Sequence, residues 1–137
     1  MKLIQPIVLM LLLVVLIGHD SSSGQSPQDK LPSDIRIAFK VGNAKELSRF
    51  FNTTIELVVL DKEDVYSKVQ AEQILDKFFS DYYPKSFKFI HEGGKGESQF
   101  AIGQLVTFNG TFRVYLLVKK KNNKPFIHQL RIEKENE

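Results

Sequence analysis

Apolar and polar residues alternate through much of the C-terminal part of the chain, and this pattern predicts a meander of long strands. The alternation runs over residues 99–133 and is interrupted at Asn109-Gly110 and again at residues 122–125. Both residues of an Asn-Gly pair tolerate the positive φ of a type I′ turn, so the first interruption favours a tight hairpin. The second predicts a turn of two or three residues before another strand.

The predicted hairpin determines which side chains face the core. With Asn109-Gly110 as the loop, Phe108 pairs with Thr111 and Leu105 pairs with Val114. Successive side chains of a strand point to opposite faces, so one face should cover the core while the other faces away. We expect the core face to carry Leu105, Val114, Leu116 and Val118, and the opposite face to carry Gln104, Arg113 and Tyr115.

One broken helix or two short helices are predicted shortly before the first strand. Ser33 suits the N-cap of the first, Gly42 ends it, and Asn43 can cap the second. Apolar residues recur at helical spacing in both, at Ile35, Ala38, Phe39, Leu47, Phe50 and Phe51.

The clearest amphipathic helix begins after Ser67. Ser67 and Gln70 fit a capping box, in which the hydroxyl and the amide satisfy each other's backbone N–H groups. The apolar residues that follow share one helical face: Ala71, Ile74, Leu75, Phe78 and Phe79. Pro84 stops the helix. Short strands are predicted over residues 54–60 and 86–91, with turns at residues 61–64 and 93–96.

The order of these elements predicts an α+β fold, a single domain over residues 33–137 in which a curved antiparallel sheet wraps around helices. That order resembles the nuclear-transport-factor-2-like, or cystatin-like, cone. The segments AFKVGNAKEL (38–47), VYSKVQAE (65–72) and QLRIE (129–133) resemble a family of uncharacterised exported bacterial domains, domain of unknown function 4783. The resemblance covers residues 32–134. It implies a cone-shaped fold and export, but no reaction.

The N-terminal segment reads as an export signal. An unbroken apolar run over residues 7–17 has signal-peptide length and is short for a membrane span. Small polar residues follow, so we expect a signal peptide at residues 1–24 and a flexible lead-in at residues 25–32. A retained membrane anchor is the alternative. Mass spectrometry of the exported protein should find an N-terminus between Gly18 and Pro27, whereas an intact Met1 in a membrane fraction would support the anchor.

Composition narrows the possible partners and the source of stability. The 137 residues carry a net charge of +3 with both signs well mixed, whereas nucleic-acid binding usually needs a clustered basic excess. We therefore expect no nucleic-acid partner, and contact with a membrane only through the signal peptide. The chain has no cysteine, so a hydrophobic core, to which eleven phenylalanines can contribute, must supply the stability.

His128 is the first candidate for a functional residue. Parity along residues 126–132 places it on the same face as Leu130 and Ile132, inside the cone, where it could act as a base or bind a ligand. A satisfied polar residue at the cone mouth or at a subunit contact is the favoured interpretation, because the sequence shows no partner for a catalytic pair. A slip of one residue in the turn at 122–125 would exchange the faces.

Arg113, Tyr115 and Arg131 form a second candidate site on adjacent strands. A guanidinium group matches the geometry of a carboxylate, so the cluster would suit an anionic ligand. The favoured interpretation is again structural, with exposed arginines paired to some of the many glutamates.

These observations favour an exported, non-enzymatic binding or scaffold domain. Its cone would hold a small apolar ligand or be filled by its own phenylalanines, and the sheet could mediate a homodimer. The alternative is a small cavity enzyme of the isomerase, dehydratase or hydrolase type, with His128 as base and Tyr115 or Arg131 as helper. The acidic base, tyrosine donors or Asp–His pair of enzymes with this fold cannot be placed on the chain. No cofactor or metal is expected. A His128 side chain that points into an open cavity would favour the enzyme, and one that does not would favour the binding or scaffold domain.

Overall fold

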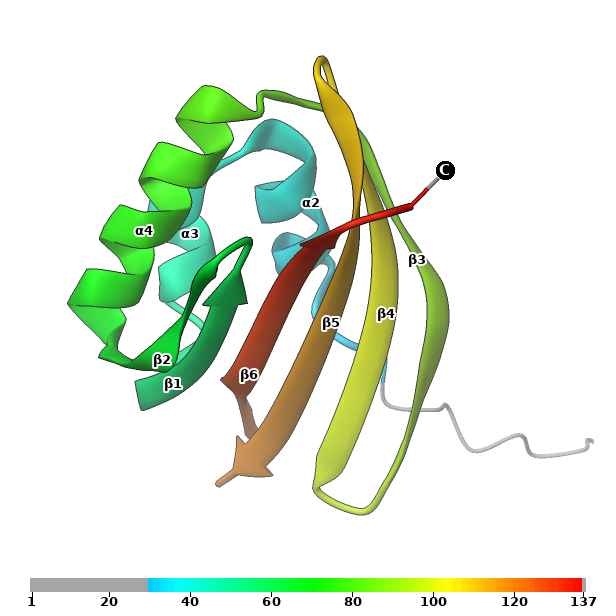
Figure 1. Ribbon diagram of the computed structural model, residues 1–137. Coiled ribbons are helices and arrows are strands. Elements are labelled where there is room, and N and C mark those ends of the chain that lie inside the picture. Colours follow the sequence, from blue (N-terminus) through cyan, green and yellow to red (C-terminus); the bar gives the residue numbers. More distant parts are fainter. Residues whose placement is uncertain (1–29, 137) are drawn as a thin grey trace, which may run out of the picture.

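A computed structural model describes residues 30–136, which form one curved sheet with helices on one of its faces (Figure 1). The six strands lie in the order β2-β1-β6-β5-β4-β3, and all neighbours are antiparallel except the parallel pair β1 and β6. The elements in chain order are α2 (Ser33–Val41), α3 (Ala44–Ser48), β1 (Phe51–Val59), β2 (Lys62–Ser67), α4 (Lys68–Asp81), β3 (Pro84–Lys95), β4 (Ser98–Thr107), β5 (Gly110–Lys121) and β6 (Lys124–Lys134).

The predicted signal peptide at residues 1–24 and most of the predicted lead-in at residues 25–32 lie outside the described residues. Leu31, near the end of that lead-in, is only 8% exposed and belongs to the core. The folded domain therefore begins at or before Leu31. None of the helices in residues 30–136 is long and apolar enough to cross a membrane.

Helices α2 and α3 follow the predicted pattern except at their outer ends. Pro32 occupies the N-cap of α2, so Ser33 is its first helical residue and provides no side-chain cap. Gly42 ends α2 with a left-handed φ of 68°, and the Asn43 side chain accepts a hydrogen bond from the Glu46 N–H, as predicted. Helix α3 is shorter than expected, because Phe51 already belongs to β1.

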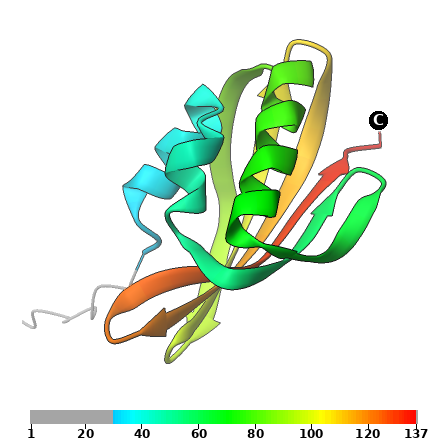
Figure 2. The same cartoon turned by 90° about the vertical axis from the view of Figure 1, so that its left-hand side faces the viewer.

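Helix α4 confirms the strongest helical prediction. Ser67 Oγ accepts from the Gln70 N–H at 3.2 Å, and Gln70 Oε1 accepts from the Ser67 N–H at 3.1 Å, which completes the capping box. The predicted apolar face is buried at Ala71, Leu75, Phe78 and Phe79 and partly buried at Ile74. Figure 2 shows α4 alongside α2 and α3 over the same face of the sheet.

The β1–β2 hairpin differs from the prediction at residues 61–64. These residues are not only a turn, since Lys62 already pairs with Val59 and strand β2 extends to Ser67. Strand β2 is a sheet edge whose side chains are almost all exposed. Charged exposed residues are typical of edge strands because they discourage pairing with other chains.

The β4–β5 hairpin keeps the predicted faces but not the predicted register. Its loop is Phe108-Asn109, so Leu105 pairs with Phe112 in place of Val114. The partner of each β4 residue moves by two positions, and a shift by an even number leaves every side chain on its predicted face. Leu105, Val114, Leu116 and Val118 are fully buried, as predicted.

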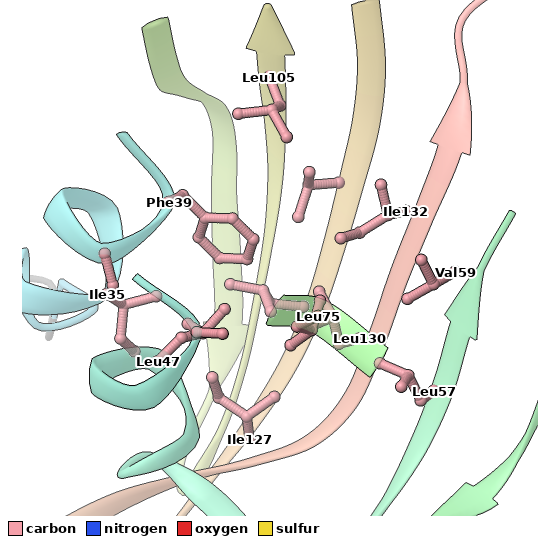
Figure 3. Packing of buried hydrophobic residues seen from close by; sticks show 14 of the residues in the cluster. Ile35, Phe39, Leu47, Leu57, Val59, Leu75, Leu105, Ile127, Leu130 and Ile132 are labelled. Atoms are coloured by element: carbon pink, nitrogen blue, oxygen red, sulfur yellow. The ribbon is translucent and has the colours of Figure 1, made fainter. Parts of the chain in front are cut away.

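The core between the sheet and the helices is filled by aliphatic and aromatic side chains (Figure 3). Phe39 lies at its centre, with its ring stacked on Phe87 at 4.7 Å and edge-on to Phe79 at 6.2 Å. Phe78 packs edge-on against Phe112 at 5.1 Å. The phenylalanines thus occupy the space between sheet and helices that a hollow cone would leave open.

Candidate functional site

The outer face of the sheet, the one that the helices do not cover, carries all four residues predicted as candidate ligands. Tyr115 on β5 lies directly opposite Arg131 on β6, and Arg113 lies opposite Glu133 in the next outward-facing pair. The structure therefore brings together Arg113, Tyr115 and Arg131 as predicted. His128 lies farther along β6, separated from Tyr115 and Arg131 by the Leu117–Gln129 pair.

Glu133 engages part of the Arg131 guanidinium group. One of its carboxylate oxygens accepts from both Nε and Nη2 of Arg131, at 3.2 and 2.8 Å. The hydrogen bonds from Arg131 to this carboxylate hold the pKa of the arginine above its ordinary value. The cluster is thus an exposed ion pair on a sheet face, an arrangement that usually contributes little to stability.

The predicted position of His128 inside the cone is wrong. Strand β6 has an extra residue at this point, because Val118 pairs with Ile127 while Leu117 pairs with Gln129. A bulge of this kind exchanges the faces of the residues beyond it. Ile127 and Leu130 are both fully buried, and His128 and Gln129 between them both line a cleft on the outer face.

The cleft at His128 has a volume of about 220 Å³ and lies across several strands. Its lining consists of Asn52, Thr54, Glu56, Val65, Leu117, Lys119, His128 and Gln129. Burial and the nearby charge of Lys119 lower the pKa of His128 from its ordinary value, which favours the neutral imidazole. Within residues 30–136, no group of three or more His, Cys, Asp or Glu side chains could hold a metal ion.

A second hollow lies between the β1–β2 hairpin and helix α4, on the helix side of the sheet. This α4 groove has a volume of about 390 Å³, within the range typical of small-molecule sites. It is bounded by Val59, Leu60, Asp61, Lys62, Tyr66, Gln70, Gln73, Ile74, Lys77, Phe78, Asp81 and Tyr82. Apolar and aromatic side chains therefore meet a polar rim.

Two of the rim charges neutralise each other. Lys77 Nζ contacts Asp81 Oδ2 at 3.2 Å, one turn apart on α4. Lys62 and Asp61 belong to the hairpin that closes the opposite side, where Leu60 has a left-handed φ of 56° and donates its N–H to the Ile132 carbonyl. The sequence does not reveal this groove because residues 61–64 of its hairpin wall are predicted as a turn, whereas Ile74 and Phe78 lie on the apolar face of α4 as predicted.

Comparison with known proteins agrees with this architecture. The family described as Domain of unknown function (DUF4783) matches residues 32–133. A DUF4783 protein from Bacteroides uniformis is 39% identical, with a TM-score of 0.74, over 79% of this chain and 100% of that one. A DUF4783 protein from Bacteroides ovatus is 37% identical, with a TM-score of 0.74, over 78% of this chain and 97% of that one. No curated protein matches the chain.

More distant structures share the fold alone. A protein of unknown function with a cystatin-like fold from Nostoc punctiforme is 14% identical, with a TM-score of 0.59, over 75% of this chain and 84% of that one. The predicted nuclear-transport-factor-2-like cone is thus confirmed, in the form of a curved, unclosed sheet with helices on one face.

Proposed function

We propose that this chain, which belongs to the DUF4783 family, is an exported domain that binds a small ligand in the α4 groove and catalyses no reaction. The observation that carries the proposal is the α4 groove itself, a hollow of ligand size with an apolar, aromatic wall that the core leaves uncovered. Export rests on the predicted signal peptide alone.

The placement of ionisable side chains favours binding over catalysis. His128, the residue on which the enzyme alternative depends, lies on the outer sheet face, whereas the α4 groove opens on the helix side. The carboxylate of Asp81, at the groove rim, is paired with Lys77. Asp61 is the other carboxylate of the rim, and no histidine is among the described residues that line the groove to form a catalytic pair with it.

The lining also indicates the class of ligand. Val59, Ile74 and Phe78 offer apolar contact, and Tyr66 and Tyr82 add aromatic surface. Lys62 at the rim can attract a negative group. A small molecule with an apolar or aromatic body and one anionic end matches this distribution, since burial of the body supplies affinity and the charge sets its orientation.

Titration with 8-anilinonaphthalene-1-sulfonate, an aromatic sulfonate, tests the α4 groove. The purified protein should bind this probe saturably with increased fluorescence. Ile74→Gln, which places an amide on the groove wall, should weaken binding by about tenfold, equivalent to about 1.4 kcal/mol. Val69→Gln is the matched control, because Val69 is on the same helix, 62% exposed and outside the groove.

Both variants should first be shown to be folded by circular dichroism. Equal affinities of the two variants would place the probe elsewhere, and an absence of saturable binding to the unaltered protein would contradict a preformed groove.

A sheet-mediated homodimer is the second candidate function. The outer face carries a row of half-buried apolar residues, including Ile102, Tyr115 and Leu117, and Ile102 lies directly opposite Tyr115. A stable dimer buries about 800 Å² on each partner, and the outer face is the broad surface without helices.

Sedimentation equilibrium should then give twice the mass of the chain. Ile102→Lys should return it to a monomer, while Val41→Lys, at a 55% exposed position on α2, should not. A monomer over the whole micromolar range would remove the dimer from consideration.

A further inference from the structure

His128 lies where two irregularities of the sheet meet. On its β5 side, β6 carries an extra residue between the pairs Val118–Ile127 and Leu117–Gln129. On its β1 side, Phe51 pairs with Ile127 and Glu56 with Gln129, so five steps along β1 match only two along β6. Because regular pairing is interrupted on both sides of the same residue, the outer face is opened into the cleft at this position.

Bulges often change the direction of a side chain near a functional site. Here the interruption turns an imidazole away from the core and into a polar hollow, although its neighbours Ile127 and Leu130 remain fully buried.

Several hydrogen-bond donors line the cleft. Lys119 contributes an ammonium group, and no carboxylate among residues 30–136 lies within salt-bridge distance of it. His128 contributes one ring N–H, and the Asn52 amide, which already donates to the Thr54 carbonyl at 3.2 Å, retains a second hydrogen. Leu117 and Val65 add apolar surface that partly excludes water and so strengthens electrostatic contacts.

The one carboxylate of the cleft is already engaged. Glu56 Oε2 accepts a hydrogen bond from the Gln129 side chain at 2.9 Å, on the β1 side of His128. Lys119 lies on the other side of His128, on β5. Positive and negative charges are thus separated across the cleft, with the unpaired positive charge beside the imidazole.

We propose that this cleft is a binding site for an oxyanion, the carboxylate or phosphate group of a small ligand, held between Lys119 and His128. This site is on the opposite face of the sheet from the α4 groove and does not depend on it.

The proposal includes a direction of pH dependence. Among the cleft residues, the charged groups that face His128 are Lys119 from β5 and Glu56 from β1, while β2 contributes only Val65. In the free protein, burial and Lys119 lower the pKa of His128. A bound anion would favour the imidazolium and raise that pKa, so binding takes up a proton and strengthens as the pH falls from the pKa of the complex towards the lower pKa of the free protein.

Two-dimensional NMR of the histidine ring signals during titration with inorganic phosphate, and separately with sodium acetate, tests the site. His91 is an internal reference, because it is on the outer face of β3 against the Phe100 ring at 5.5 Å, away from the cleft. We expect the His128 signals to shift saturably and the His91 signals to move little. Saturation by both salts indicates a general oxyanion site, and saturation by one salt alone identifies the favoured group.

Three variants distinguish the cleft from general attraction to a positively charged protein. Lys119→Gln should weaken binding by about tenfold, as expected for a lost hydrogen bond to a charged group. Glu56→Gln should strengthen it severalfold, because a repelling charge is removed while the side chain keeps its size. Lys121→Gln, two positions along β5 at an exposed site outside the cleft, should change it by less than about twofold.

Several results would overturn the proposal. They are the absence of a saturable shift with either salt, equal shifts of His91 and His128, and equal losses in Lys119→Gln and Lys121→Gln. Affinity for acetate, which stays largely ionised over this range, that does not rise between pH 8 and pH 5.5 would also contradict a site that includes His128.

Discussion

Replacing Phe78 with alanine should lower the free energy of unfolding by about 3–5 kcal/mol. Phe78 is only 4% exposed, and its ring contacts those of Phe79, Tyr82 and Phe112 at centroid distances between 5.1 and 5.6 Å. Phe78 packs between α4 and β5. Its removal would leave a cavity between these two elements, which the rest of the core holds in place. The loss is a large share of the roughly 5–15 kcal/mol that stabilises a typical domain.

Chemical denaturation monitored by circular dichroism measures this change. Phe108→Ala is the matched control, because Phe108 is 68% exposed at the β4–β5 loop, where its ring lies beside the exposed Tyr83 ring and under the Lys85 ammonium group. We expect it to cost less than about 1 kcal/mol. Equal denaturation midpoints for Phe78→Ala and the unaltered protein would show that the apolar face of α4 is wrongly assigned.

Helix α4 was predictable because its determinants are local. The capping box needs only Ser67 and Gln70, three residues apart, and the apolar face follows from a fixed spacing along one helix. The same reasoning holds for the Asn43 cap of α3. Ser33 was misplaced because Pro32 is itself suited to the start of a helix, and the choice between adjacent starts carries little energy.

Strand β2 could not be recognised because its first three residues are charged, and Val65 and Tyr66 alone are too short a run to predict a strand. Lys62, Glu63 and Asp64 are exposed on an edge, so no burial pattern constrains them. Their pairing with β1 follows from the hairpin at Leu60, whose left-handed φ is unusual for a leucine. Strand β2 also forms one wall of the α4 groove, so the groove could not be predicted without that strand.

The β4–β5 loop illustrates how tertiary contacts overrule a local turn preference. The Asn109 side chain donates to the Asp81 carbonyl at 3.1 Å, and the Phe108 N–H donates to the Tyr83 carbonyl at 3.2 Å. Both acceptors belong to the end of α4 and the segment after it. These bonds favour Phe108-Asn109 as the loop, and the residue predicted as part of it, Gly110, begins β5.

His128 was misassigned for a different reason. Strict alternation assumes a regular strand, and a bulge leaves no signature in the composition of residues 126–132. The turn at Asn122-Asn123 is a regular two-residue turn with φ values of 53° and 61°, so it does not cause the exchange of faces. The bulge lies beyond it, within β6. By contrast, Arg113, Tyr115 and Arg131 come together as predicted, because their pairing beyond the bulge follows simple alternation.

Gly103→Ala should destabilise the fold by about 1–3 kcal/mol, although it adds only one methyl group. A Cβ atom at this position on β4 would lie 2.5 Å from Cζ of Phe87 and 3.2 Å from the Lys88 carbonyl oxygen. The Phe87 ring cannot move aside easily, since it is 6% exposed, stacked on Phe39 at 4.7 Å and edge-on to Phe89 at 5.1 Å. Displacing it would disturb the contact between α2 and the sheet.

Gly93→Ala provides the matched control, because it makes the same change on the adjacent strand at a similar distance from an aromatic ring. Its Cβ would lie 2.7 Å from Cζ of Phe100, but that ring is on the outer face and partly exposed, so it can rotate away. We expect a cost below about 1 kcal/mol at Gly93, measured as the difference in denaturation midpoint from the unaltered protein. Equal losses at the two glycines would mean that strand strain dominates. A larger loss at Gly103 alone would show that the rigid stack of Phe39 and Phe87 sets the cost.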